Sequence, residues 1–412
     1  MAPTPQSGAS IRNAFLPGGF SSARRGRMQP RANQRWHERC SSHFAALPGA
    51  TIRTMTNPDQ GATDIRLPYP VVFAPPYLRT PLRCRPQHVG PRPSAPRSRC
   101  ATLQKIPPMS SPRWQGIFPA ITTKFHADES LDAEGTARHI DFQIRNGIHG
   151  LVTCGSLGEA STLTLEEKLE VARIALQAAA GRVPVLANVS ETSTREALRY
   201  IDGANRLGVA GFMVMPSVIY VADAREAMLN VRTMAKAAQQ PIMVYNNPVA
   251  YRVDLKPEHM LELADCEWIS AIKESSDDIR RITDLRNTVG QRYQLFLGVD
   301  DLAYEGLALG CDGLLAGVGC AFPRETVALY ELMKAGRFAQ ALALYQWMTP
   351  MLHLDVSTKL VQNLKLIDVL VGVGTEHMRR PRLPLIGPER AAIERIVRHA
   401  LDTRPAEYRS LA

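Results

Sequence analysis

The chain has 412 residues, of which 45% are hydrophobic, and a formal net charge of +10. Residues 1–108 contain 16 Lys and Arg and 3 Asp and Glu, which gives a net charge of +13. The rest of the chain contains 33 Lys and Arg and 36 Asp and Glu, which gives a net charge of −3. No apolar run approaches the roughly 18 to 20 residues needed to span a bilayer. The main part of the chain is therefore expected to be a mildly acidic soluble protein that binds neither nucleic acid nor membrane.

The first 108 residues are expected to be disordered, because they carry 17 of the 30 prolines and show no sustained helical or strand period. Three interpretations compete: a start assigned upstream of a true initiator at Met109, an organelle transit peptide, or a basic arm that binds nucleic acid. Met109 lies just ahead of the first patterned segment, which favours the first interpretation. Prolines throughout the segment disfavour an amphipathic transit peptide.

From residue 116 onward, short apolar runs alternate with amphipathic helical stretches, as in a parallel sheet with crossover helices. The eight runs are 116–123, 150–156, 184–190, 211–217, 241–247, 269–275, 294–300 and 313–319. Eight such units predict a (β/α)8 TIM barrel, here over residues 109–325. A doubly wound open sheet is disfavoured because no Gly-x-Gly-x-x-Gly turn follows the first strand. Further helical patterns predict a C-terminal helical extension over residues 326–412.

The seven cysteines show no spacing typical of a metal site: Cys40, Cys84, Cys100, Cys154, Cys266, Cys311 and Cys320. They are expected to be small reduced thiols, which indicates a cytoplasmic protein. Neither a metal nor another cofactor is expected.

Lys273 ends the sixth apolar run, and Tyr245 lies near the end of the fifth. In a TIM barrel, chemistry takes place where strands end and the following loops begin. An ammonium at the end of an apolar strand is poorly solvated, so its pKa should fall below the usual value of about 10.4. A neutral lysine can form a Schiff base with a carbonyl substrate, and a tyrosine can move the protons that this chemistry requires.

Residues 114 to about 400 resemble the dihydrodipicolinate synthase and N-acetylneuraminate lyase family of class I, lysine-dependent aldolases, in the order and spacing of Ser156, Tyr245 and Lys273. The resemblance implies that Lys273 forms the Schiff base and Tyr245 transfers protons. The segment 155–159 is similar to the family's loop that holds the carboxylate of a 2-oxo acid, with Ser156 supplying a hydroxyl. The implied catalytic residues are Lys273, Tyr245 and Ser156, and the implied substrate-binding residues are Gly155, Ser156, Leu157, Gly298 and Leu315.

The sequence departs from the synthases of that family at two positions. The synthases carry an Arg two residues after the proline of the tyrosine motif, where this chain has Ala250, and Arg252 is the nearby candidate to compensate. They also place a tyrosine, which reaches a neighbouring subunit, directly after the proline that ends strand four. Here the first tyrosine after Pro216 is Tyr220, four positions later.

These departures favour a reaction of a single 2-oxo acid or its cyclic imine. The stretch resembles the branch whose members deaminate 1-pyrroline-4-hydroxy-2-carboxylate to 2-oxoglutarate semialdehyde and ammonia. The alternatives are a 4-hydroxy-tetrahydrodipicolinate synthase and a 2-keto-3-deoxy sugar acid dehydratase or aldolase. Outside enzymes, an inactive barrel could bind nucleic acid or a partner through the basic segment, or sense a 2-oxo acid. The resemblance implies a homotetramer that acts on a small molecule.

Several polar residues near the strand ends are expected to have structural roles. Glu159 is expected to hold its loop by hydrogen bonds, and Asp300 and Asp301 to be helix N-caps. Asn246 and Asn247 could bond turn backbone or line the pocket. Three more residues are expected to be surface or packing groups: His139, His353 and Asp355.

Overall fold

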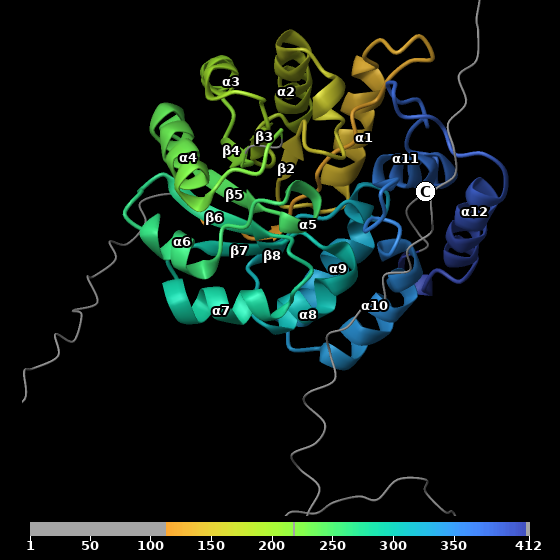
Figure 1. The fold of residues 1–412 in the computed structure, drawn as a ribbon. Helices are drawn as coiled ribbons and strands as arrows, with labels where there is room; N and C mark the ends of the chain where they lie inside the picture. Colours follow the sequence, from red (N-terminus) through yellow and green to blue (C-terminus); the bar gives the residue numbers. More distant parts are fainter. Residues whose placement is uncertain (1–112, 217–218, 409–412) are drawn as a thin grey trace, which may run out of the picture. The chain divides into compact units, whose positions relative to one another are not determined.

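The computed structural model describes residues 113–216 and 219–408, and in it strands and helices alternate along the chain (Figure 1). The strands are β1 (Gly116–Ile117), β2 (Leu151–Thr153), β3 (Val185–Val189), β4 (Gly211–Val214), β5 (Ile242–Asn246), β6 (Ile269–Glu274), β7 (Gln294–Leu297) and β8 (Gly313–Leu314). Each lies within one of the eight predicted apolar runs. The end of the fourth run, at residue 217, and the predicted disordered segment 1–108 lie outside the described residues.

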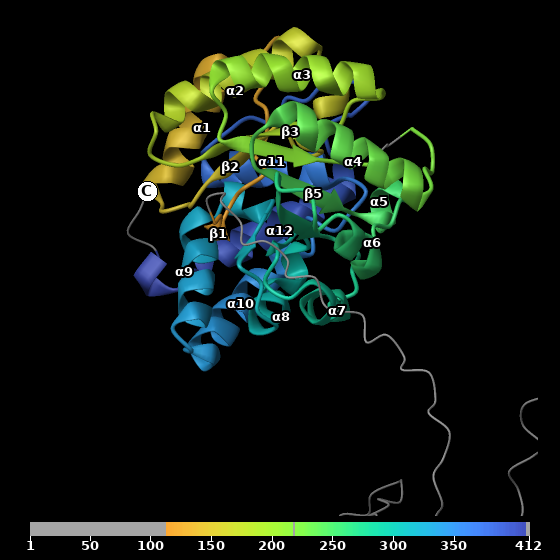
Figure 2. The same ribbon diagram turned by 90° about the vertical axis from the view of Figure 1, so that its left-hand side faces the viewer.

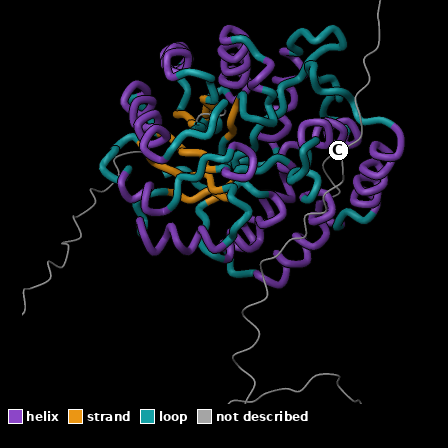
Figure 3. Tube along the Cα trace, viewed as in Figure 1, coloured by secondary structure: helices purple, strands orange, loops and turns teal. Residues whose placement is uncertain are grey.

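The helices between the strands form a ring around them, as Figure 3 shows. They are α1 (Ala133–Arg145), α2 (Leu165–Ala179), α3 (Thr194–Leu207), α4 (Ala224–Ala238), α5 (Pro248–Tyr251), α6 (Pro257–Glu262), α7 (Arg280–Val289) and α8 (Ala303–Ala308). Capping boxes begin α2 at Thr164 and α4 at Asp223. In each box the side chain of the capping residue accepts from a backbone N–H that would otherwise lack a partner.

All eight strands are parallel, in the order β1-β8-β7-β6-β5-β4-β3-β2. A parallel bridge from Ala120 to Val152 joins the segment after β1 to β2 and so links the two ends of the sheet. The TIM-barrel prediction is therefore confirmed. Since parallel strands all end on the same side, the loops after them gather at one mouth of the barrel.

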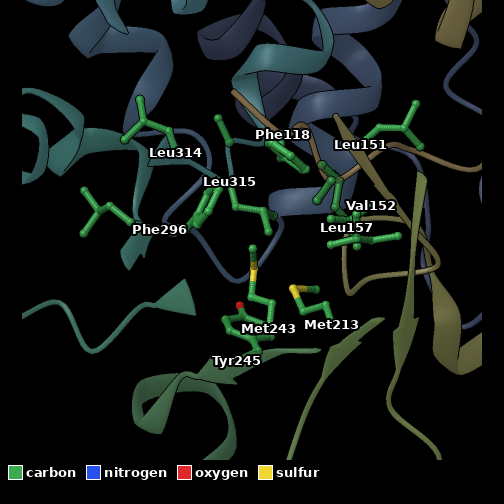
Figure 4. Close-up of a cluster of buried hydrophobic side chains, with 14 of the residues drawn as sticks. Phe118, Leu151, Val152, Leu157, Met213, Met243, Tyr245, Phe296, Leu314 and Leu315 are labelled. Atoms are coloured by element: carbon green, nitrogen blue, oxygen red, sulfur yellow. The ribbon is translucent and has the colours of Figure 1, made fainter. Parts of the chain in front are cut away.

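The barrel interior is filled by large apolar side chains (Figure 4). Phe118 and Phe296 meet edge to face, with ring centroids 5.2 Å apart. Toward the carboxyl ends of the strands this packing continues into Met213, Tyr245 and Leu315, which all border the cavity described below. Because the interior is closely packed, the position of a residue along its strand determines where its side chain lies at the mouth.

Four helices follow β8: α9 (Pro323–Lys334), α10 (Phe338–Leu352), α11 (Leu360–Val371) and α12 (Gly387–Asp402). Helices α9 and α10 lie side by side (Figure 2), and α12 packs on both α10 and α11. Among the described residues, no helix combines the length and apolar character needed to cross a membrane. The exact boundary of the predicted helical extension, residues 326–412, stays a prediction.

Two buried ion pairs attach α11 to loops of the barrel mouth. Lys365 Nζ lies 2.5 Å from Glu159 Oε1, and Lys124 Nζ lies 2.5 Å from Asp368 Oδ2. All four side chains are almost fully excluded from solvent. Breaking such a pair leaves an uncompensated buried charge, so these contacts hold α11, and with it the segment between α10 and α11, in place over the mouth.

Candidate active site

Lys273 and Tyr245 lie side by side at the mouth of the barrel, because β5 and β6 pair with Tyr245 opposite Lys273. The Lys273 Nζ lies 3.9 Å from the centroid of the Tyr245 ring. Both side chains are buried, with 6% of each exposed. The structure thus brings together the two residues on which the sequence prediction rests.

Burial lowers the pKa of Lys273 to about 8, against an opposing effect of Asp355, Tyr251 and Asp300. A substantial fraction of the amine is therefore neutral near physiological pH, as a nucleophile must be. Gly298 lies directly against this side chain, because a Cβ built there would be 2.1 Å from Lys273 Cε.

Tyr245 is a neutral phenol over the physiological pH range. Burial raises its pKa to about 12, although Asn247 Nδ2 donates a hydrogen bond to its hydroxyl over 3.0 Å. Because this bond occupies one lone pair and does not use the O–H, the phenol can donate to a group beside the lysine. Asn247 lines the cavity, whereas Asn246 is buried behind it and bonds Asp254, Glu274 and the backbone of Leu255.

A cavity of about 310 Å³ opens above these two residues. Its walls include every predicted site residue: Lys273, Tyr245, Ser156, Gly155, Leu157, Gly298 and Leu315. The structure brings them together, but their roles in binding and catalysis stay predictions.

The loop after β2 presents backbone donors to this cavity. Within the described part of the chain, the N–H groups of Ser156 and Leu157 have no intramolecular acceptor, while the N–H groups of Glu159 and Ala160 fold back onto the loop. Free backbone N–H groups beside a hydroxyl are donors of the kind that bind a carboxylate. The side chain of Leu157, by contrast, packs into the apolar core.

Tyr251 contributes a hydroxyl that the sequence prediction missed. It is the last residue of α5, and its hydroxyl is hydrogen-bonded to Ser156 Oγ. Its ring meets the Tyr245 ring edge to face, with centroids 6.1 Å apart. The Asn247 side chain caps α5 through Ala250 N, and Arg252 ends the helix with a φ of 62°. Each of these signals is local and weak, so the sequence alone did not reveal the contact.

Neither residue considered as a replacement for a missing family residue lies in the cavity. Arg252 is exposed, and Tyr220 has 55% of its surface exposed. The cavity wall after β5 is formed instead by Val249 and Ala250. Lys273 is the only cationic side chain among the described residues that line this cavity.

The prediction that Asp300 and Asp301 cap a helix is wrong. Asp300 is buried and accepts hydrogen bonds from the backbone N–H groups of Gly317 and Val318, so it fixes the loop after β8. Burial raises its pKa to about 6. Asp301 lies 2.9 Å from Nδ1 of the exposed His353.

The prediction that Asp355 is a surface or packing group is also wrong. Asp355 lies between α10 and α11 and lines the cavity together with Lys273. A Cβ added to Gly317 would be 2.1 Å from Asp355 Oδ1, so this glycine makes room for the carboxyl group. A second carboxylate, Asp277, lines the same cavity.

The structural roles expected for Glu159 and His139 are confirmed. Glu159 is fully buried, pairs with Lys365 and accepts from Arg379 N over 3.2 Å. His139 is buried beside Asp368, and burial lowers its pKa to about 4. Within residues 113–216 and 219–408, no group of three or more His, Cys, Asp and Glu is placed to hold a metal ion.

Comparison with known proteins gives a consistent result. Residues 113–400 match the Dihydrodipicolinate synthetase family. A "4-hydroxy-tetrahydrodipicolinate synthase" of Methanoculleus marisnigri is 33% identical over 272 residues, which cover 65% of this chain and 93% of that protein. A protein of the same name from Pelobacter propionicus is 30% identical, covering 68% of this chain and 96% of that protein.

Solved structures agree with the sequence relatives. Dihydrodipicolinate synthase from Aquifex aeolicus superposes with a TM-score of 0.67 at 26% identity, over 69% of this chain and 98% of that one. YagE from E. coli K12, solved in complex with pyruvate, also superposes with a TM-score of 0.67. It is 29% identical, and the match covers 70% of this chain and 98% of that one. The match over most of the described residues and the shared barrel establish that the chain belongs to the Dihydrodipicolinate synthetase family.

Proposed function

We propose that this protein is a lysine Schiff-base lyase or deaminase that acts on a single 2-oxo acid or its cyclic imine. The substrate proposed is 1-pyrroline-4-hydroxy-2-carboxylate, and the products are 2-oxoglutarate semialdehyde and ammonia. The observation that carries this choice is the cavity lining: Ala250 stands where the synthases have a carboxylate-binding Arg, and Asp277 and Asp355 are the other acidic groups that line the cavity with Lys273. A second substrate carboxylate would meet no cation there.

The substrate carboxylate binds the free N–H groups of Ser156 and Leu157, which places C2 of the ring within reach of Lys273. The neutral amine adds to the C2=N bond, and transimination opens the ring and leaves a free amine on C5. The protonated lysine imine then acidifies C3–H, since the electron pair from C3 can move onto the imine nitrogen. Tyr245, beside the lysine, takes part in the proton transfers at this centre.

Loss of the 4-hydroxyl as water produces a C3=C4 double bond conjugated with the imine. Movement of a proton from C5 to C3 gives a C4=C5 enamine, and transfer of a proton from its nitrogen to C4 converts this enamine into an imine at C5. Water then hydrolyses this imine to the aldehyde and ammonia. A second water releases the 2-oxo acid from Lys273. One water is formed and two are consumed, so the reaction consumes one water overall.

A second candidate is condensation by a 4-hydroxy-tetrahydrodipicolinate synthase, because the curated relatives carry that name. A 2-keto-3-deoxy sugar acid dehydratase or aldolase would use the same lysine and also needs no second carboxylate pocket. A non-catalytic protein that binds nucleic acid or a partner through residues 1–108 is disfavoured by the intact Lys273 and Tyr245 pair. The homotetramer stays part of the proposal.

The test is ammonia release from 1-pyrroline-4-hydroxy-2-carboxylate by the full chain, with Lys273→Arg as a matched control that keeps the positive charge and removes the nucleophile. We expect release by the natural protein and none by the control. Consumption of pyruvate with aspartate semialdehyde, without ammonia release, would establish the synthase instead. Borohydride reduction with pyruvate reports imine formation independently of either product.

A further inference from the structure

Asp355 is a carboxyl group inside the catalytic cavity that the steps above leave unused. Loss of a hydroxyl group from C4 requires a proton donor, because hydroxide is a poor leaving group. We propose that Asp355 protonates the departing hydroxyl of the substrate. This inference rests on the proposed function, since it assigns the acid for the dehydration step.

The geometry gives Asp355 access to the substrate. Its segment, residues 353–359, crosses the mouth between α10 and α11, and Val356, Ser357 and Thr358 line the cavity with it. Among the described residues, no side chain or backbone N–H donates a hydrogen bond to its carboxylate. Gly317 leaves space for Oδ1, and Asp355 itself lines the cavity.

Several other polar groups in or near the cavity have interactions of their own. Tyr245 lies against Lys273 and therefore serves the carbons next to the imine. Ser275 Oγ donates to Gly298 O over 3.0 Å, and Asp300 accepts two backbone hydrogen bonds. Asp277 also lines the cavity, but its charged neighbour is Asp301, whereas Asp355 interacts electrostatically with Lys273.

The surroundings of Asp355 favour its protonated form. Its pKa is raised well above the usual value by burial and by the neighbouring Asp300 carboxylate, with Asp301 adding to the shift and Lys273 opposing it. A like charge beside a poorly solvated carboxyl group disfavours ionisation. A carboxyl group whose protonated form is favoured in this way can act as a general acid.

The step is balanced. The enamine electron pair forms the C3=C4 bond while the C4–O bond breaks and its electrons leave with oxygen. The Asp355 proton moves to that oxygen to form water, and Asp355 is left as a carboxylate. The proton removed earlier from C3 is left over in this balance, and its transfer to Asp355 restores the acid.

The experiment compares Asp355→Asn with Asp277→Asn, which changes the other carboxylate of the cavity in the same way. We expect Asp355→Asn to release ammonia about 10²- to 10⁴-fold more slowly, while C3 still exchanges with deuterium from D2O and borohydride still traps the pyruvate imine. The fall in rate at alkaline pH should disappear in this variant. Asp277→Asn should show a smaller loss and keep the alkaline fall.

A substrate with fluoride in place of the 4-hydroxyl provides the rescue, because fluoride leaves without a proton. Asp355→Asn should release fluoride at nearly the rate of the natural protein. Equal loss with both leaving groups, or loss of imine trapping, would show that Asp355 only shapes the cavity and would overturn the inference. An unchanged rate and pH profile would overturn it while the deaminase assignment stands. Absence of ammonia release by the natural protein would remove both.

Discussion

The close contact between Gly298 and Lys273 allows a sharp test of how precisely the lysine must be placed. In Gly298→Ala, the new Cβ would lie 2.1 Å from Lys273 Cε, 2.3 Å from Ser275 Oγ and 2.9 Å from Lys273 Cγ. Ordinary contacts begin at 3.4 Å, so Cε must move by about 3.4 − 2.1 = 1.3 Å. The backbone at Gly298 does not require glycine, which makes the effect one of space rather than of strain.

A displacement of about 1 Å of a reacting group costs on the order of 10²-fold in rate. We therefore expect Gly298→Ala to form the pyruvate imine about 100-fold more slowly, as followed by borohydride trapping and mass spectrometry. Overpacking should also lower the free energy of unfolding by about 1–3 kcal/mol. Saturating pyruvate should not restore the rate, because the defect lies in the position of the nucleophile.

Gly319→Ala is the matched control, since its new Cβ would be 3.4 Å from Ala316 Cβ and 3.7 Å from Thr326. This variant should trap pyruvate at the natural rate. If Gly298→Ala also trapped at the natural rate while folded, Lys273 would have an alternative productive conformation, and the reasoning from its fixed position would be refuted.

Three further predictions concern the site and its support. Tyr251→Phe removes the hydroxyl bonded to Ser156, so steady-state turnover should fall about 10- to 100-fold while imine trapping stays unchanged; equal loss in both would assign Tyr251 a role in folding the site. Because the reactive form of Lys273 is the neutral amine, trapping should accelerate about tenfold per pH unit up to its pKa of about 8 and then level off; a continued rise toward pH 10 would contradict the burial effect. Lys365→Met leaves Glu159 buried without its partner, which should lower the free energy of unfolding in urea by about 3–5 kcal/mol; addition of Glu159→Gln should recover part of that loss.

The barrel and its central pair were predictable from the sequence for a definite physical reason. Strands buried on both faces appear as short apolar runs, and eight of them separated by helical patterns have few alternative arrangements. Since parallel strands end on one side, residues at the ends of the fifth and sixth runs had to lie close together. Tyr245 and Lys273 are indeed opposite each other in the β5–β6 register.

The roles that sequence reasoning missed depend on contacts between segments that are far apart in the sequence. Tyr251 depends on a four-residue helix that ends in a left-handed residue, Arg252, and Asp355 lies about 40 residues beyond β8. Asp300 was mistaken for an N-cap because an aspartate before a helical pattern usually is one. Its side chain instead bonds the loop after β8, a contact that only the closed barrel creates.

The difference between the predictable strand-end residues and the residues that were missed suggests where the substrate specificity of the protein resides. The proposed chemistry requires a neutral amine and a phenol, and both are fixed by strand register. The electrostatic character of the cavity is set by peripheral positions: Ala250 contributes no charge, and Asp355 enters from the segment between α10 and α11. The buried pair of Lys365 and Glu159 anchors α11 to the loop after β2. It therefore links the segment between α10 and α11 to the proposed carboxylate site. A change of substrate therefore needs no change in the barrel, only in side chains that strand patterns do not reveal.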